Sequence, residues 1–258
     1  MDFAAEHLRW WDYWLKGIDN HVMDDAPVHY YVMGEPEATA WHSAQTWPLP
    51  QEKRTAYYFG PGKSLGTAVP QGQGRDEKTV DYSAAVDPDP RWSLETKFPE
   101  LSAHDAKGFS YTTPPLAAPL EVTGHPLAHL WVSSSATDAD LFVYLEEVDT
   151  KGRSRYVSEG MLRASNRATV APGYDTAGLP WHRGNRADRQ PLKPGEPVEL
   201  VFDLYPTSTR FAAGHRLRVT VTGADARNAR TPRLSPPPRL TVYREAGRAS
   251  YVELPVIP

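Results

Sequence analysis

The first eighteen residues carry one stripe of mostly apolar side chains at helical spacing. Phe3, His7, Trp10, Trp11, Trp14, Leu15 and Ile18 recur every three or four positions, which is the spacing of one face of an α-helix. Asp2 stands where a helix N-cap is favoured, and Gly17 can take the left-handed conformation that ends a helix. The pattern predicts a helix from Asp2 to Gly17 whose tryptophan-rich face has to be buried against something.

From Val28 onward the hydrophobic period changes to two, the period of a β-strand. His215–Thr222 alternates apolar and polar residues, which predicts a strand with one face in solvent. In Leu141–Leu145 both alternating sets are apolar, so we expect that strand to be covered on both faces. The other predicted strands are Val28–Met33, Arg54–Phe59, Thr79–Tyr82, Pro119–Thr123, Pro126–Ser135, Leu141–Val148 as a whole, Ser154–Ser165, Val198–Leu204, Arg239–Arg244 and Tyr251–Leu254.

Glycine and proline clusters separate these strands, and the chain holds 25 prolines. We expect Gly66–Lys78 to be a loop and Asp87–Lys107 to be irregular or briefly helical. Many short strands with almost no helix are typical of an antiparallel β-sandwich of jelly-roll type. The predicted organisation is therefore an N-terminal helix and linker over residues 1–26, followed by a mainly β jelly-roll domain over residues 27–258.

Charge and composition limit the partners and the compartment. The net charge of −4 gives no reason to expect nucleic acid or an anionic membrane as a partner. No apolar run is long enough to span a bilayer, and the N-terminus does not have the pattern of a signal peptide, so a cytoplasmic location is favoured. Cysteine is absent, which excludes disulfides and thiolate chemistry.

Gly62-Lys63-Ser64-Leu65-Gly66 matches G-x-S-x-G, the turn that presents the nucleophile of α/β-hydrolases. That turn needs a strand before it and a helix after it. Tyr57–Phe59 could supply the strand, but Thr67–Gly72 contains proline and glycine and cannot begin a helix. We interpret the motif as a glycine-rich turn rather than as a catalytic serine.

Other polar groups favour structural roles over metal binding. His125 and His129 would lie about 13 Å apart along a strand, beyond the reach of one ion. His7 is expected in a core or an interface. Asp138 and Asp140, with the nearby Glu146, Glu147 and Asp149, lack the spacing of a calcium loop and are interpreted as turn residues and a solvated strand end. The arginines at 153, 155, 163 and 167 are expected on a solvated or ion-paired face. We expect no cofactor.

Tryptophans on a β-sandwich can also form a sugar-binding platform. Trp41, Trp47, Trp92 and Trp181 lie in predicted loops, and Trp131 lies mid-strand, where a core position is favoured. Carbohydrate binding stays open as an alternative function.

Four segments together resemble one hydrolase family. They are HLRWWDYWLKGIDNHVMDDAPVHYYVMG, FSYTTPPLAAPLEVTGHPLAHLWVSSSATDADLFVYLEEVDTKGRSRYVSEGMLRAS, LPWHRG and LVFDLYPTSTRFAAGHRLRVTVTGAD. In this order they are similar to the cocaine-esterase-like (CocE/NonD) and X-Pro dipeptidyl-peptidase serine hydrolases, from the last helix of the catalytic domain through the C-terminal domain.

The resemblance implies an enzyme with an α/β-hydrolase domain, a helical cap and a galactose-binding-like jelly roll. Its Ser-Asp-His triad would precede the first helix of this chain, so no triad position is carried over and catalysis by the chain alone is uncertain. The expected role is a non-catalytic C-terminal domain that supports or completes a hydrolase. Trp10, Trp11 and Trp14 are the candidate interface with a hydrolase subunit or a second copy. The alternatives are a hydrolase active by itself through Ser64 and a carbohydrate-binding module.

Overall fold

The computed structural model describes residues 2–86 and 99–258. The predicted helix is present as α1 (Phe3–Lys16). The Asp2 side chain accepts hydrogen bonds from the backbone N–H groups of Ala4 and Ala5, and Gly17 ends the helix with φ 70°. Both capping assignments made from the sequence are therefore confirmed.

The rest of the described chain is mainly β. Its strands are β1 (Val28–Tyr31), β2 (Trp41–Ala44), β3 (Lys53–Phe59), β4 (Leu65–Gly66), β5 (Arg75–Thr79), β6 (Phe109–Thr112), β7 (Leu120–Gly124), β8 (Leu127–Ser134), β9 (Asp140–Val148), β10 (Ser154–Arg163), β11 (Val198–Asp203), β12 (Thr207–Phe211), β13 (Arg216–Thr222), β14 (Arg239–Glu245), β15 (Arg248–Ala249) and β16 (Tyr251–Ile257). Short helical segments are η1 (Val22–Asp24), η2 (Pro61–Lys63), α2 (Ser102–Asp105), η3 (Ala164–Asn166) and η4 (Arg186–Asp188).

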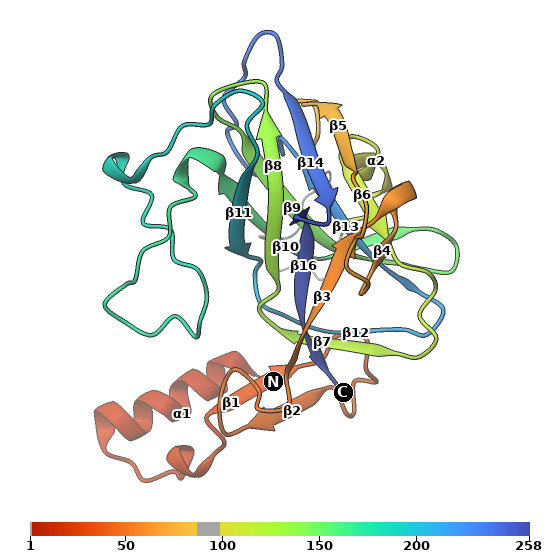
Figure 1. Ribbon diagram of the computed structural model, residues 1–258. Coiled ribbons are helices and arrows are strands. Elements are labelled where there is room, and N and C mark those ends of the chain that lie inside the picture. Colours follow the sequence, from red (N-terminus) through yellow and green to blue (C-terminus); the bar gives the residue numbers. More distant parts are fainter. Residues whose placement is uncertain (1, 87–98) are drawn as a thin grey trace.

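Two antiparallel sheets form the body of the protein. One has four strands in the order β10-β9-β13-β6, and the other has ten strands that include the path β12-β7-β16-β8-β14-β15. β8 lies at the centre of the larger sheet because β11 pairs along one edge while β16 and β14 share the other. The β1–β2 hairpin is a separate two-stranded sheet beside α1, below the sandwich in Figure 1.

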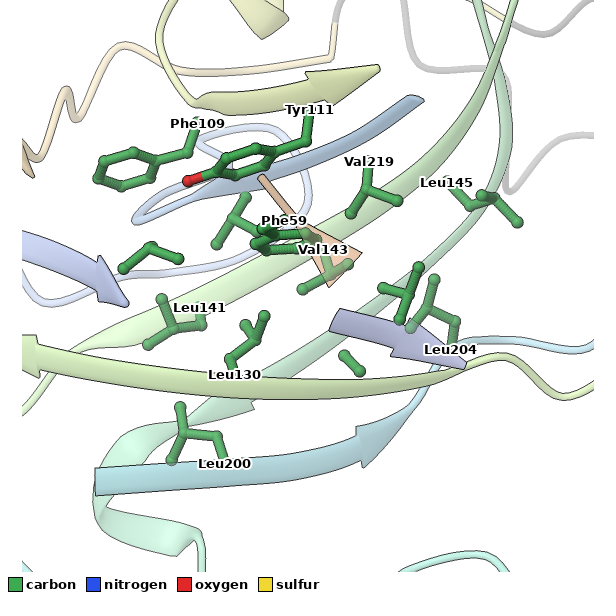
Figure 2. Close-up of a cluster of buried hydrophobic side chains, with 14 of the residues drawn as sticks. Phe59, Phe109, Tyr111, Leu130, Leu141, Val143, Leu145, Leu200, Leu204 and Val219 are labelled. Atoms are coloured by element: carbon green, nitrogen blue, oxygen red, sulfur yellow. The ribbon is translucent and has the colours of Figure 1, made fainter. Parts of the chain in front are cut away.

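The core lies between the two sheets (Figure 2). Leu130 and Leu200 of the larger sheet face Leu141 and Val143 of the smaller one, and all four are buried. As expected, β9 is covered on both faces, since every residue from Leu141 to Val148 is buried.

One strand prediction was shifted. β5 occupies Arg75–Thr79 and pairs with β14. The predicted loop Gly66–Lys78 is therefore wrong in its last part, and the predicted strand Thr79–Tyr82 starts where β5 ends. Four of its five residues are charged, so hydrophobic periodicity could not reveal it. β2, β6 and β12 were also missed, and α2 lies inside the segment expected to be irregular or briefly helical. Residues 87–98 of that segment lie outside the described residues.

Candidate functional site

α1 turns its polar side toward the rest of the chain. Arg9 and Tyr13 are half-buried, and Arg9 forms ion pairs with Glu6 and Asp25. The hydrogen bond to Asp25 raises the pKa of Arg9. Asn20 donates a hydrogen bond of 2.7 Å from Nδ2 to the carbonyl of Arg9, which ties the linker back onto the helix. Polar contacts therefore hold α1 to its own chain.

The opposite side of α1 is the tryptophan stripe, and it faces solvent. Trp10, Trp11 and Trp14 are 42%, 52% and 54% exposed, and no residue of the helix is buried. His7 is also exposed, so it does not lie in the core, and its position at an interface stays a prediction. A surface helix of a folded domain normally places its apolar stripe inward. α1 does the reverse within the described chain.

The exposed apolar surface is larger than the three tryptophans. We use the term α1 patch for the exposed large apolar side chains of α1 and the linker that follows it: Phe3, Leu8, Trp10, Trp11, Trp14, Leu15, Ile18 and Met23. Tyr31 and Trp41 are exposed on the neighbouring hairpin, with their ring centroids 5.3 Å apart. Contiguous exposed apolar surface of this kind is typical of protein–protein contact sites.

Backbone hydrogen bonds join the hairpin to the sandwich. Met33 donates to the carbonyl of Ser208 at 2.9 Å and accepts from the N–H of Arg210 at 2.8 Å. The Arg210 side chain also forms an ion pair with Glu35 at 3.4 Å. The hairpin next to the α1 patch therefore has a defined position relative to β12.

Ser64 is not placed as a hydrolase nucleophile. It follows a short helical turn, η2, and precedes strand β4 rather than a helix, as the flanking sequence predicted. Its hydroxyl donates to the carbonyl of Pro61 at 2.8 Å. Ser64 lines an open groove with Arg216 and Arg218, and the residues that line this groove include no histidine. Among the residues that the structure describes, the Ser64 hydroxyl therefore has a backbone partner and no histidine in the groove beside it.

Two of the histidines, His182 and His129, have clear structural partners. Both ring nitrogens of His182 contact backbone carbonyls, of Asn166 at 3.2 Å and of Val201 at 2.8 Å. His129 stacks on Tyr251, with ring centroids 4.3 Å apart. Burial lowers the pKa of His129. Within residues 2–86 and 99–258, no group of three or more histidine and carboxylate side chains is arranged to hold a metal ion.

The acidic turn before β9 is occupied by protein contacts. Asp138 accepts hydrogen bonds from the backbone N–H and the hydroxyl of Ser165, at 2.9 and 2.7 Å. Asp140 forms a two-point ion pair with Arg163, at 2.7 and 3.0 Å. Asp138 lies in the turn, as interpreted, and Arg163 is ion-paired, as expected, but Asp140 is the first residue of strand β9 rather than a turn residue.

The glutamates at the end of β9 correct the sequence interpretation, which placed them at a solvated strand end. Glu146 is 0% exposed, and burial raises its pKa well above the usual value. Glu147 is also buried, forms an ion pair with Arg155 at 2.5 Å and is hydrogen-bonded to Nδ1 of His215 at 2.7 Å. Two consecutive buried carboxyl groups are possible because β9 is covered on both faces.

Trp131 also differs from its expected core position. It is half-buried, because Leu130 and Val132 on either side of it point into the core and turn it to the outer face of the sheet. Trp181 is exposed at 42% and meets Tyr174, with ring centroids 5.7 Å apart. The sequence identified Trp181 as an available loop aromatic but could not supply its neighbours.

The family described as the X-Pro dipeptidyl-peptidase C-terminal non-catalytic domain has a sequence model that matches residues 20–253. This chain belongs to that family. The assignment confirms the family and the non-catalytic role expected from the resemblance, namely the C-terminal domain of CocE/NonD and X-Pro dipeptidyl-peptidase hydrolases. α1 precedes the matched residues.

In two curated relatives, the region that matches this chain is only part of a longer protein. A protein of Mycobacterium tuberculosis whose name assigns it to the serine esterases is 40% identical over 267 residues, which cover 100% of this chain and 41% of that protein. The cocaine esterase of a Rhodococcus species is 27% identical, over 87% of this chain and 38% of that protein. The chain therefore spans about two fifths of the length of these relatives.

Solved structures of hydrolases contain the same fold. A CocE/NonD family hydrolase from Staphylococcus aureus superposes with a TM-score of 0.75 and 21% identity, over 99% of this chain and 45% of that chain. An α-amino acid ester hydrolase superposes with a TM-score of 0.71 and 21% identity, over 96% of this chain and 44% of that chain. In both, the matching fold is less than half of the protein.

Proposed function

We propose that this chain completes an α/β-hydrolase by docking the α1 patch onto the part of the enzyme that carries the Ser-Asp-His triad. The observation that carries the proposal is the orientation of α1, which holds its own chain with polar contacts and turns Trp10, Trp11 and Trp14 to solvent. The substrate class is an acyl ester or an X-Pro peptide, as the names of the relatives suggest.

The energetics favour a covered state of the α1 patch. Complete burial of one large apolar side chain is worth about 1.5–3 kcal/mol. The three tryptophans are each about half exposed, so covering them would contribute several kcal/mol on the same scale. The remaining α1 patch residues add to this gain, which offsets part of the cost of association.

The relatives support a hydrolase as the occupant. The match to the mycobacterial protein includes the whole of this chain, so it includes α1, and it leaves about 59% (100 − 41) of that protein outside the match. The non-catalytic family match begins only at residue 20, after α1. A helix that accompanies the domain without belonging to it supports a role at the junction with the preceding hydrolase part. If α1 docked onto a second copy of this chain instead, it would remain unexplained that the match to the mycobacterial protein includes α1 while the family match begins after it.

We also propose that the sandwich is a jelly roll of the galactose-binding-like type. Two antiparallel sheets that share one core support this topology. An experimental structure that traced the strands in a different sheet order would refute it.

A chimera tests the proposed function. In it, this chain replaces the matching C-terminal region of the mycobacterial protein, and a fluorophosphonate probe labels activated serines. We expect one label in the hydrolase part of the chimera, ester hydrolysis by the chimera, and no label on the isolated chain. Ser64→Ala should leave labelling of the chimera unchanged. A label on Ser64 of the isolated chain, or a chimera with no activity, would contradict the proposal.

A further inference from the structure

A second group of exposed apolar side chains lies away from α1. Within the described residues, and apart from the isolated Val69 and Leu234, the large apolar side chains exposed outside the α1 patch and the hairpin gather in one region. They are Met161, Tyr174, Trp181 and Tyr205. Met161 comes from β10, Tyr174 and Trp181 from the long connection between η3 and β11, and Tyr205 follows β11.

These side chains border a cleft. Two hollows of about 480 and 370 Å³ adjoin each other and share Phe142, Met161 and Asp203 in their walls. Trp181 lines the larger hollow, and Tyr205 lines the smaller one. The walls of the cleft also hold charged residues, such as Asp203 and Arg230. A cleft bordered by aromatic side chains can receive an anchor side chain of a partner protein.

Hydrogen bonds shape the walls of this cleft. Ser158 donates from Oγ to the carbonyl of Tyr205 at 2.6 Å, and the N–H of Tyr205 donates to the carbonyl of Glu159 at 2.8 Å. At Gly160, a Cβ atom would meet the carbonyl oxygen of Asp203 at 2.4 Å, so only glycine allows β10 to approach β11 this closely. The cleft is therefore formed before any partner binds, which reduces the entropy lost on docking.

A short stretch of chain that leads into β12 connects the cleft to the hairpin beside the α1 patch. Tyr205 precedes Ser208 by three residues, and the carbonyl of Ser208 accepts the hydrogen bond from Met33 at the base of the hairpin. Three residues span at most about 10 Å. In the view of Figure 1, α1 and the connection between η3 and β11 both project to the left of the sandwich. One large partner can reach both surfaces.

We propose that the cleft is a second contact with the same hydrolase part, and this inference rests on the proposed function. The occupant is a projecting segment of that part with an apolar anchor side chain between Met161 and Trp181. Arg230 lines the larger hollow and has no ion-pair partner within the described residues, so a carboxylate beside the anchor is the matching chemistry. The mycobacterial relative has about 59% of its length outside the match, which supplies the needed segment.

Hydrogen–deuterium exchange separates the inference from the function on which it rests. Amide exchange is compared between the isolated chain and the mycobacterial chimera, in peptides that cover residues 3–16 and residues 170–184. We expect at least tenfold slower exchange in the chimera for both peptides, because docking excludes water from both surfaces. A peptide around Val69, which is exposed outside both surfaces, should exchange at the same rate in both proteins.

Each result decides between the two claims. Slower exchange of residues 3–16 without any change in residues 170–184 overturns the cleft proposal and leaves the docking of α1 in place. Slower exchange of residues 170–184 alone supports the cleft and rejects α1 as the junction. No change in either peptide rejects both. Concentration-dependent slowing of residues 170–184 in the isolated chain would make the occupant a second copy and overturn the proposal.

Two substitutions give an independent measurement on the chimera. Met161 is 57% exposed, so Met161→Asp should not disturb folding of the isolated chain, and Trp181→Ala removes the opposite wall. Each should return the exchange of residues 170–184 in the chimera to within threefold of the isolated chain. Val69→Asp is the matched control and should have no effect. Unchanged protection in both cleft variants would overturn the proposal.

Discussion

Arg218 on β13 donates a hydrogen bond of 2.7 Å from Nη1 to Oδ2 of Asp105 at the end of α2. Burial alone would raise the pKa of Asp105, but the hydrogen bond and the charge of Arg218 lower it. Glu146 is close enough to interact with Asp105, and burial together with the charge of Asp105 raises its pKa. The pKa values of the two neighbouring carboxyl groups therefore shift in opposite directions.

Glu146→Gln should make stability less dependent on pH. The folded state holds the proton of Glu146 above pH 4.5, the ordinary pKa at which the unfolded chain releases it. The free energy of unfolding should therefore fall as pH rises above 4.5, by up to about 1.4 kcal/mol per pH unit, until the raised pKa is passed. Glutamine has nearly the same shape but carries no such proton. Urea unfolding at pH 5, 6.5 and 8 measures the difference in slope.

Glu196→Gln is the control for this experiment, because the Glu196 side chain is 56% exposed and lies on a turn. Its slope should match that of the wild type. If Glu146→Gln and the wild type lose stability equally between pH 5 and 8, Glu146 is not the group that titrates.

Arg218→Met should destabilise the fold strongly. It leaves the Asp105 carboxylate, 6% exposed, without its cationic partner, and breaking a buried ion pair in this way costs about 3–5 kcal/mol. Arg218 is itself 21% exposed, so we expect the lower end of this range, about 3 kcal/mol. Denaturant unfolding at pH 7 provides the value. Adding Asp105→Asn should recover part of the loss, and a double variant no more stable than Arg218→Met would argue against the pair.

Gly160→Ala should destabilise the junction of β10 and β11. The added Cβ would lie 2.4 Å from the carbonyl oxygen of Asp203, which is backbone and cannot rotate away. Overpacking of this kind costs about 1–3 kcal/mol. Gly173→Ala is the matched control, since nothing lies within 4 Å of its Cβ position. Thermal unfolding should show a lower Tm for Gly160→Ala only, and equal Tm values would mean that the two strands separate without strain.

The sequence predicted those elements whose identity depends on local pattern. α1 was predicted with both caps because its stripe, Asp2 and Gly17 act within one segment, and β9 was predicted as doubly covered because both of its alternating sets are apolar. β5 was not predicted, because its partner, β14, lies more than 150 residues away and four of its own five residues are charged. Strand pairing of this kind is decided by tertiary contacts, which a single-sequence pattern does not contain.

In the candidate site, too, the sequence predicted what depends on local pattern and missed what depends on tertiary contacts. The stripe of Trp10, Trp11 and Trp14 was predicted to need a covering surface, and the structure leaves it exposed. The cleft of Met161, Trp181 and Tyr205 could not be predicted, because its walls come from distant segments of the chain that only the fold brings together. The buried Glu146 was also missed, since acidic residues at the end of a strand ordinarily indicate solvent.

The central claim is that the tryptophan stripe of α1 is covered by a hydrolase. Its most direct test is the dissociation constant between this chain and the hydrolase part of the mycobacterial protein, produced as separate polypeptides and measured by isothermal titration calorimetry. We predict a one-to-one complex for the wild type and at least 100-fold weaker binding for a variant with Trp10, Trp11 and Trp14 all changed to serine, with its β fold intact by circular dichroism. Equal affinity of the two proteins would contradict the account.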